Sequence, residues 1–63
     1  MISDFLKKYR AENGLTQAEL ATKLSISQNA VSQYENEKRK PPVSSLSGFA
    51  KALGVAVSDI MQQ

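Results

Sequence analysis

Residues Leu15–Asn36 read LTQAELATKLSISQNAVSQYEN, and this run contains two helix starts in close succession. Thr16 followed by Glu19 has the spacing of a capping box, in which each side chain accepts a hydrogen bond from the other residue's backbone N–H. Ser27 is a second residue of the type that caps helices. We therefore predict two short helices, over Gln17–Leu24 and Gln28–Asn36.

The connection between these two helices is very short, because only Ser25, Ile26 and Ser27 separate them. A joint of this length makes two helices cross steeply rather than lie antiparallel. The small side chain of Ala21 permits the close approach that such a crossing requires. The pattern predicts a helix-turn-helix over about residues 17–36.

Helices are also predicted on both sides of this unit. Apolar residues recur at helical spacing from Ile2 onward and predict a helix over about Asp4–Asn13, which Ser3 caps. A similar pattern predicts a helix over Val43–Leu53, and Ser58 caps a short final helix. No segment alternates as a strand does, so we expect an all-α fold in a single domain spanning residues 1–63.

One face of the predicted helix Gln28–Asn36 carries polar side chains without charge. An ordinary solvated face favours Glu, Lys and Arg, which form ion pairs at helical spacing and keep a surface soluble. Amides can instead form two hydrogen bonds with the edge of adenine. The face therefore predicts contact with DNA bases, and its members are Gln28, Asn29, Ser32, Gln33 and Asn36.

The composition argues against several other classes of protein. The 63 residues include no histidine and no cysteine, and the carboxylates are scattered, so we expect no enzyme, no catalytic residue, no metal and no cofactor. The net charge of +2 is a weak sign of a polyanionic partner. Charges near the start and the lack of a long apolar run argue against a secretory signal or a membrane partner, so we expect a cytoplasmic protein.

The chain resembles the Cro and phage-repressor type of helix-turn-helix proteins, often called the xenobiotic-response-element family. The matching segments are Gly14–Ala21, Val31–Asn36, Lys38–Pro41 and Phe49–Val55, so the resemblance covers nearly the whole chain. It implies a five-helix fold like that of the lambda repressor, and a transcriptional repressor of bacteria or their phages. It also implies a homodimer on a pseudo-palindromic operator of double-stranded DNA, and we expect no small-molecule ligand.

The resemblance also implies roles for individual residues. Gln28, Asn29, Ser32 and Gln33 match positions that read bases. Gln17, at the start of its helix, matches a glutamine that clamps a phosphate. The other positions near the sugar–phosphate backbone are Thr16, Ser27, Asn36, Lys38, Arg39 and Lys40. The sequence departs from the family at Ser25, where the turn often has glycine, and at Gly48 inside a predicted helix.

Arg10 and Glu35 are predicted to form a salt bridge between the first and third helices, with a structural role rather than a contact to DNA. Tyr9, Tyr34 and Phe49 are predicted to belong to the core. An alternative function remains open, because the same fold serves protein-binding modules such as antitoxins. The apolar residues of the tail, which are Val55, Val57, Ile60 and Met61, are expected to be exposed and to suit either such a partner or a second copy of this chain.

Overall fold

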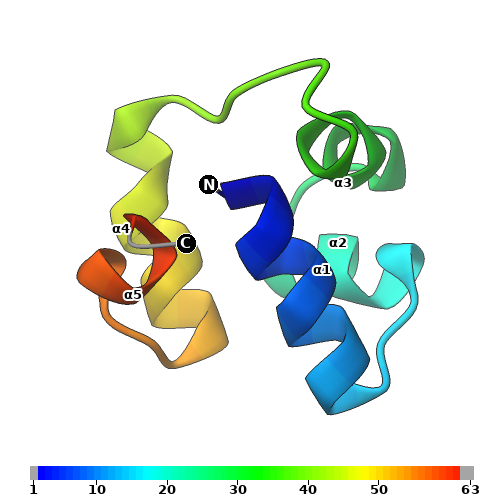
Figure 1. Cartoon of the computed structure of the whole chain (residues 1–63), viewed down its shortest axis with the longest axis horizontal. Coiled ribbons are helices and arrows are strands. Elements are labelled where there is room, and N and C mark those ends of the chain that lie inside the picture. The colour runs from blue at the N-terminus through cyan, green and yellow to red at the C-terminus, as the bar shows by residue number, and fades with distance from the viewer. Residues whose placement is uncertain (1, 62–63) are drawn as a thin grey trace.

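A computed structural model describes residues 2–61 and shows five helices and no strand in that part of the chain (Figure 1). The predicted all-α, five-helix fold is therefore confirmed. Within the same range, no helix is long and apolar enough to cross a membrane. The helices are α1 (Ile2–Asn13), α2 (Gln17–Leu24), α3 (Gln28–Glu35), α4 (Val43–Leu53) and α5 (Val57–Met61).

The capping residues predicted for the central unit set the starts of α2 and α3. The Thr16 hydroxyl accepts from the backbone N–H of Glu19 at 3.0 Å, and the Glu19 carboxylate accepts from that of Thr16 at 2.9 Å. The Ser27 hydroxyl accepts from the N–H of Ala30 at 3.0 Å. The predicted bounds of α2 are confirmed, whereas α3 ends one residue early because Asn36 is its C-cap.

We expect Ser27→Ala to lower the free energy of unfolding by about 1 kcal/mol, because the N–H of Ala30 loses its acceptor. Urea unfolding followed by circular dichroism measures the change. Ser58→Ala is the matched control, since Ser58 is exposed within α5 and does not cap it. Equal losses in the two variants would contradict the capping role.

Two predicted caps are wrong. The structure has α1 already helical at Ile2, so Ser3 lies inside the first turn, where its hydroxyl is buried with no hydrogen-bond partner among residues 2–61. Ser58 lies inside α5, and the Asp59 carboxylate accepts instead from the backbone N–H of Ala56 at 3.0 Å. A carboxylate at the third helical position can reach back to the N-cap residue, so the cap of α5 is Ala56, two residues before the predicted cap at Ser58.

The turn between α2 and α3 passes through a left-handed residue. Ser25 has φ 59° and ψ 40°, a conformation that costs a residue with a Cβ atom about 1 kcal/mol. Its backbone N–H bonds to carbonyls of α2, and the N–H of Ile26 bonds to the carbonyl of Ala21 at 3.0 Å. These bonds close α2 and turn the chain sharply into α3.

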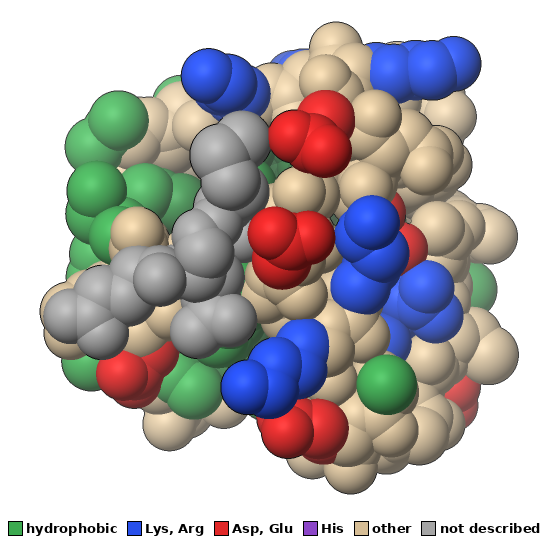
Figure 2. Space-filling model, in the orientation of Figure 1, with side chains coloured by type: hydrophobic (Ala, Val, Ile, Leu, Met, Phe, Trp, Pro, Cys, Tyr) green, Lys and Arg blue, Asp and Glu red, His purple; other side chains and the backbone are tan. Residues whose placement is uncertain are grey.

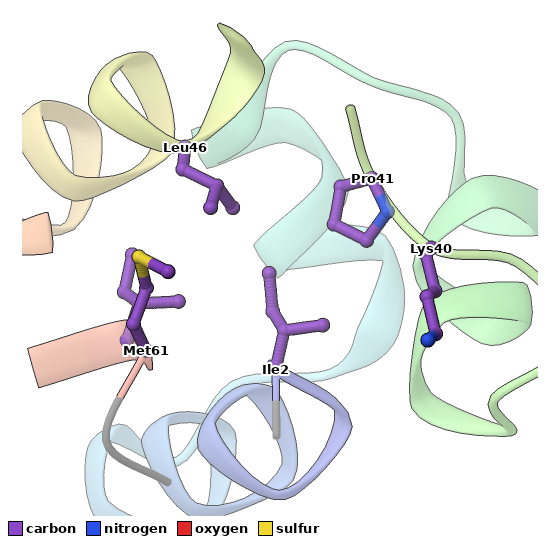
Figure 3. A pocket seen from close by; sticks show the side chains of 6 residues that line it. Ile2, Lys40, Pro41, Leu46 and Met61 are labelled. Atoms are coloured by element: carbon purple, nitrogen blue, oxygen red, sulfur yellow. The ribbon is translucent and has the colours of Figure 1, made fainter. Parts of the chain in front are cut away.

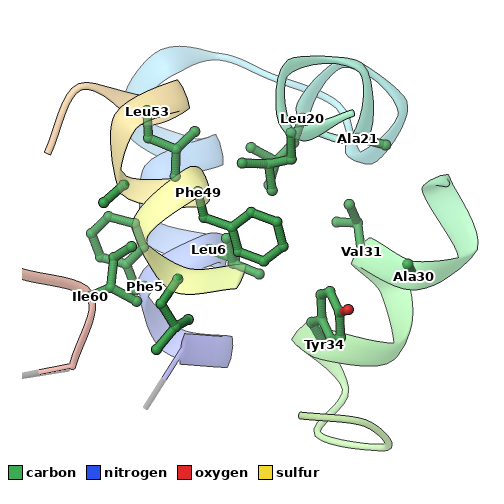
Figure 4. Packing of buried hydrophobic residues seen from close by; sticks show 13 residues of the cluster. Phe5, Leu6, Leu20, Ala21, Ala30, Val31, Tyr34, Phe49, Leu53 and Ile60 are labelled. Carbon is green, nitrogen blue, oxygen red and sulfur yellow. The ribbon is translucent and has the colours of Figure 1, made fainter. Parts of the chain in front are cut away.

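Side chains from all five helices share one hydrophobic core, and Figure 4 shows those of Leu6, Leu20 and Phe49 converging at its centre. Leu20 and Val31 are fully buried, so α2 and α3 are held at their crossing by packing from both sides. Tyr34 and Phe49 are buried as predicted, with ring centroids 6.3 Å apart, and half-buried Tyr9 packs against the core. The core thus presents the opposite face of α3 to solvent.

Candidate nucleic-acid interface

The outer face of α3 forms a polar surface with the start of α2. Gln28, Asn29 and Ser32 line a shallow depression of about 340 Å³, and Gln17 of α2 lines it too. Gln28 and Asn29 are exposed, so their amides are available to a partner. The structure therefore brings together three of the four predicted base-reading residues with the predicted phosphate-clamping glutamine.

The fourth predicted base-reading residue, Gln33, is half-buried on α3 and lies outside this depression. Asn36 is exposed beyond the end of the helix, and its amide donates to the Ser32 hydroxyl at 3.3 Å. Ser32 is thus partly engaged within the protein. The sequence pattern grouped these residues by helical spacing alone, and the structure separates them by their neighbours.

The start of α2 offers backbone donors beside the depression. The capping box satisfies the N–H groups of Thr16 and Glu19, whereas helix geometry leaves those of Gln17 and Ala18 without an intrahelical acceptor. The positive end of the helix dipole lies at the same point. Free donors and a partial positive charge at a helix start suit a phosphate group.

Glu35 joins three helices behind this surface. Its carboxylate accepts from Arg10 of α1 through Nε at 2.7 Å and Nη2 at 2.9 Å, and from Gln17 Nε2 of α2 at 3.0 Å. Arg10 Nη1 also donates to the carbonyl oxygen of Leu15 at 3.2 Å. All three guanidinium nitrogens of Arg10 are engaged within the protein, which supports the predicted structural role of the pair.

The environment of Glu35 keeps its carboxylate ionised. Its side chain is only 4% exposed, and this burial acts to raise its pKa. The hydrogen bonds from Arg10 and Gln17, together with the charges of Arg10 and Lys7, outweigh burial and hold the pKa of Glu35 below its usual range. The hydrogen bond to Glu35 in turn raises the pKa of Arg10.

The basic loop after α3, residues 38–40, makes a specific contact with the rest of the protein. Lys38, Arg39 and Lys40 are all exposed. However, the Arg39 guanidinium lies over the ring of Tyr34, with its carbon 5.8 Å from the ring centroid, a cation–π contact. Lys38 is the plainest candidate of the three for following a phosphate without fixed geometry, because it is exposed in this loop.

The expected exposure of the apolar tail is wrong for Ile60, holds only in part for Val55 and Val57, and is fully met by Met61. Ile60 is 2% exposed, because it packs into the core, and Val55 and Val57 are half-buried against it. Met61 remains 64% exposed and Val43 78% exposed. Met61 borders a cavity of about 210 Å³, shown in Figure 3, whose other lining residues are Ile2, Lys40, Pro41, Leu46 and Ile60.

Charge is mixed on the face shown in Figure 2, where acidic and basic side chains intersperse and hydrophobic ones gather on the side of α4 and α5. In the described part of the chain, no group of three His, Cys, Asp or Glu residues could hold a metal ion. The interface is therefore best defined by hydrogen-bonding groups and backbone donors around α2 and α3.

The contact between Gln17 and Glu35 was missed from the sequence. Residues this far apart in the chain meet only after α2 and α3 have crossed, and neither residue type signals the other. The cation–π contact of Arg39 with Tyr34 was also missed, because the loop conformation that permits it includes a left-handed Glu37 with φ 59°.

Helix α2 begins with a capping box, and α3 crosses it after a short turn with amide side chains on its outer face. This arrangement defines a DNA-binding helix-turn-helix domain of the kind found in transcriptional regulators. The helix-turn-helix family model matches residues 6–60, and the chain belongs to this family. An immunity repressor of Bacillus phage phi105 is 38% identical over 56 residues, which are 89% of this chain and 39% of that repressor. An uncharacterized helix-turn-helix regulator of Methanocaldococcus jannaschii is 40% identical over 55 residues, 87% of this chain and 83% of that protein.

Solved structures of this fold agree closely. The N-terminal DNA-binding domain of SinR from Bacillus subtilis is 28% identical with a TM-score of 0.83, covering 100% of this chain and 93% of that domain. SinR, the master regulator for biofilm formation, has also been solved in complex with DNA. That chain is 29% identical with a TM-score of 0.82, and the match covers 97% of this chain and 98% of that chain. The chain thus spans nearly all of these domains but less than half of the phage repressor.

Proposed function

We propose that the chain represses transcription by binding a double-stranded DNA operator, with α3 in the major groove. The observation that carries this proposal is the depression in which Gln28 and Asn29 stand exposed beside the free N–H groups at the start of α2. Amides that read bases and donors that hold a phosphate are thereby adjacent. SinR has been solved with DNA on the same fold, which supports this function.

The proposed contacts follow from exposure. Gln28 and Asn29 read base edges, with Ser32 and Gln33 as the further members of the face. The start of α2, with Thr16 and Gln17, holds one phosphate, and we propose that Ser27 and Asn36 lie near the sugar–phosphate backbone. The positive charges of Lys38, Arg39 and Lys40 add an attraction to the DNA phosphates that does not depend on the base sequence.

We propose that two copies bind together, through the side formed by α4 and α5. Exposed Val43 and Met61 lie there, and Met61 borders the apolar cavity of about 210 Å³. Two copies place two recognition helices on DNA, with half-sites about one helical turn apart. We further propose that the chain has no catalytic activity and acts in the cytoplasm of a bacterium or of a phage-infected cell.

Selection of bound duplexes from a random pool tests binding and half-site spacing together. We expect a pseudo-palindrome with A·T pairs at the positions that Gln28 and Asn29 reach. Enrichment of a single unpaired half-site would contradict the dimer. If no sequence is recovered above background, the chain does not recognise a specific operator, and a protein-binding function is favoured instead. Binding to a protein partner through apolar contacts would also weaken little as the salt concentration is raised.

Substitutions of residues that contact bases and of residues that contact the DNA backbone are expected to affect binding differently. Gln28→Ala should weaken binding to the preferred duplex by about 1–3 kcal/mol and relax the preference at one base pair. Lys38→Ala is the matched control, because it is exposed in the loop and should weaken preferred and scrambled duplexes alike.

Titrating both variants at two salt concentrations separates the two effects, because the loss of a phosphate contact also reduces the salt slope by about one unit. If Gln28→Ala leaves the ratio of preferred to scrambled affinity unchanged, the amide face does not read the sequence.

A further inference from the structure

The side chain of Gln17 is tied to the protein through one of its amide N–H groups. Its amide lies against the Glu35 carboxylate, with Nε2 at 3.0 Å from Oε1. A carboxylate that is ionised accepts hydrogen bonds only, so the nitrogen end of the Gln17 amide must face it. One N–H and the carbonyl oxygen of the amide remain for the depression that Gln17 lines with Gln28, Asn29 and Ser32.

Glu35 is itself fixed in place. Two nitrogens of Arg10 donate hydrogen bonds to the two carboxylate oxygens of Glu35, at 2.7 and 2.9 Å, and the Glu35 side chain is 4% exposed. The oxygen that accepts from Gln17 also accepts from Arg10 Nη2. A carboxylate held in this way is a rigid anchor, because neither its position nor its rotation is free.

We infer that Glu35 is a positioning residue for DNA binding, which orders the side chain of Gln17 before DNA arrives. The inference rests on the proposed function and adds to it a role for a residue that is itself buried. An unrestrained glutamine loses rotamer freedom when it meets a ligand, and that loss weakens binding. The anchor removes much of this loss in advance, while Arg10 neutralises the negative charge that would otherwise face a phosphate.

A thermodynamic cycle tests the inference. The pair is replaced by Arg10→Met with Glu35→Leu, which removes the anchor while leaving the net charge of the protein unchanged. Apolar replacement of a buried ion pair often preserves stability, and urea unfolding of each variant confirms the fraction folded. Gln17→Ala is then made in the wild-type background and in the pair-replaced background, and affinity is measured on the preferred duplex.

We expect Gln17→Ala to weaken binding about five-fold in the wild type, the size of one ordered hydrogen bond, and less than about two-fold once the anchor is gone. Lys38→Ala is the control, since Lys38 takes no part in the hydrogen bonds of Arg10, Gln17 and Glu35 and its loss should cost the same in both backgrounds. Because charge is conserved, the pair replacement should also leave the salt slope unchanged.

Equal costs of Gln17→Ala in the two backgrounds would overturn the positioning role while leaving DNA binding intact. Failure of the folded wild-type protein to bind any selected duplex would instead overturn the proposed function, and the positioning role with it. A smaller cost of Gln17→Ala in the pair-replaced background, with an unchanged cost of Lys38→Ala, supports the inference.

Discussion

Arg10→Met is expected to lower the free energy of unfolding by about 3 kcal/mol, because it leaves the Glu35 carboxylate buried without the guanidinium that pairs with it. This expected loss is at the lower end of the range for buried ion pairs, since the Arg10 side chain is 26% exposed and water can partly replace it. Gln17 would remain as a neutral donor to Glu35. Urea unfolding at pH 7 measures the loss.

The loss should shrink as the pH falls from 7 to 4. In the wild type, Arg10 and Gln17 hold the pKa of Glu35 below its unfolded value, so the stability from Glu35 is present above that value and is lost as the pH falls through the folded pKa. Without Arg10, the hydrogen bond and the charge that oppose the effect of burial on Glu35 are lost, so its pKa should lie higher in the variant than in the wild type. As the pH falls, Glu35 should therefore become protonated earlier in the variant than in the wild type, and protonation removes the cost of its unpaired charge.

Two controls accompany this experiment. Lys8→Met removes a charge from an exposed position on the same helix and should change stability by less than about 0.5 kcal/mol. Adding Glu35→Leu to Arg10→Met should recover much of the stability, because no buried charge is left unpaired. If Arg10→Met leaves unfolding unchanged while DNA affinity collapses, Arg10 contacts DNA and its structural role is wrong.

Leu20→Ala is expected to cost about 2–5 kcal/mol, since the side chain is fully buried where α2 packs against the core. A chain of 63 residues has a total stability of only about 3–9 kcal/mol at typical values per residue. The variant should therefore be largely unfolded near body temperature, and circular dichroism at increasing temperature follows the change.

Leu15→Ala is the matched control, because Leu15 is half-buried next to the start of the same helix and should cost less than Leu20. Saturating operator DNA should restore part of the helical signal of Leu20→Ala, since a ligand that binds only the folded state shifts the equilibrium toward it. A loss below about 1 kcal/mol would show that the surrounding side chains collapse into the space, against the close packing described above.

Much of the fold could be predicted because its signals are local. The capping box of Thr16 and Glu19, the cap at Ser27 and the closing Gly54 act on backbone groups within a few residues, so the start of α3 and both ends of α2 and α4 agree with the prediction. Core residues such as Tyr34 and Phe49 were also predicted correctly. The weaker predictions were Ser3 and Ser58, where a cap-forming residue type occurs inside a helix.

The candidate site was predicted in its residue types but not in its arrangement. The amides of α3 were found because they follow helical spacing, and the pairing of Arg10 with Glu35 came from their positions and from the family resemblance. Their geometry had no counterpart in the sequence, because the depression beside Gln17 forms only when α2 and α3 cross. The anchoring of Gln17 by Glu35 depends on the same crossing.

The linear order of residues therefore specified where α2 and α4 begin and end, where α3 begins, and which face of each of these helices is apolar, since backbone hydrogen bonds and periodicity operate over one or two turns. Packing between helices decided which polar groups meet and which apolar ones stay exposed. Ile60 is buried while neighbouring Met61 is 64% exposed, although both are apolar, because only one of them faces the core. Likewise, Gln17 became part of a partly buried network because the crossing of α2 with α3 placed its Nε2 at 3.0 Å from Glu35 Oε1.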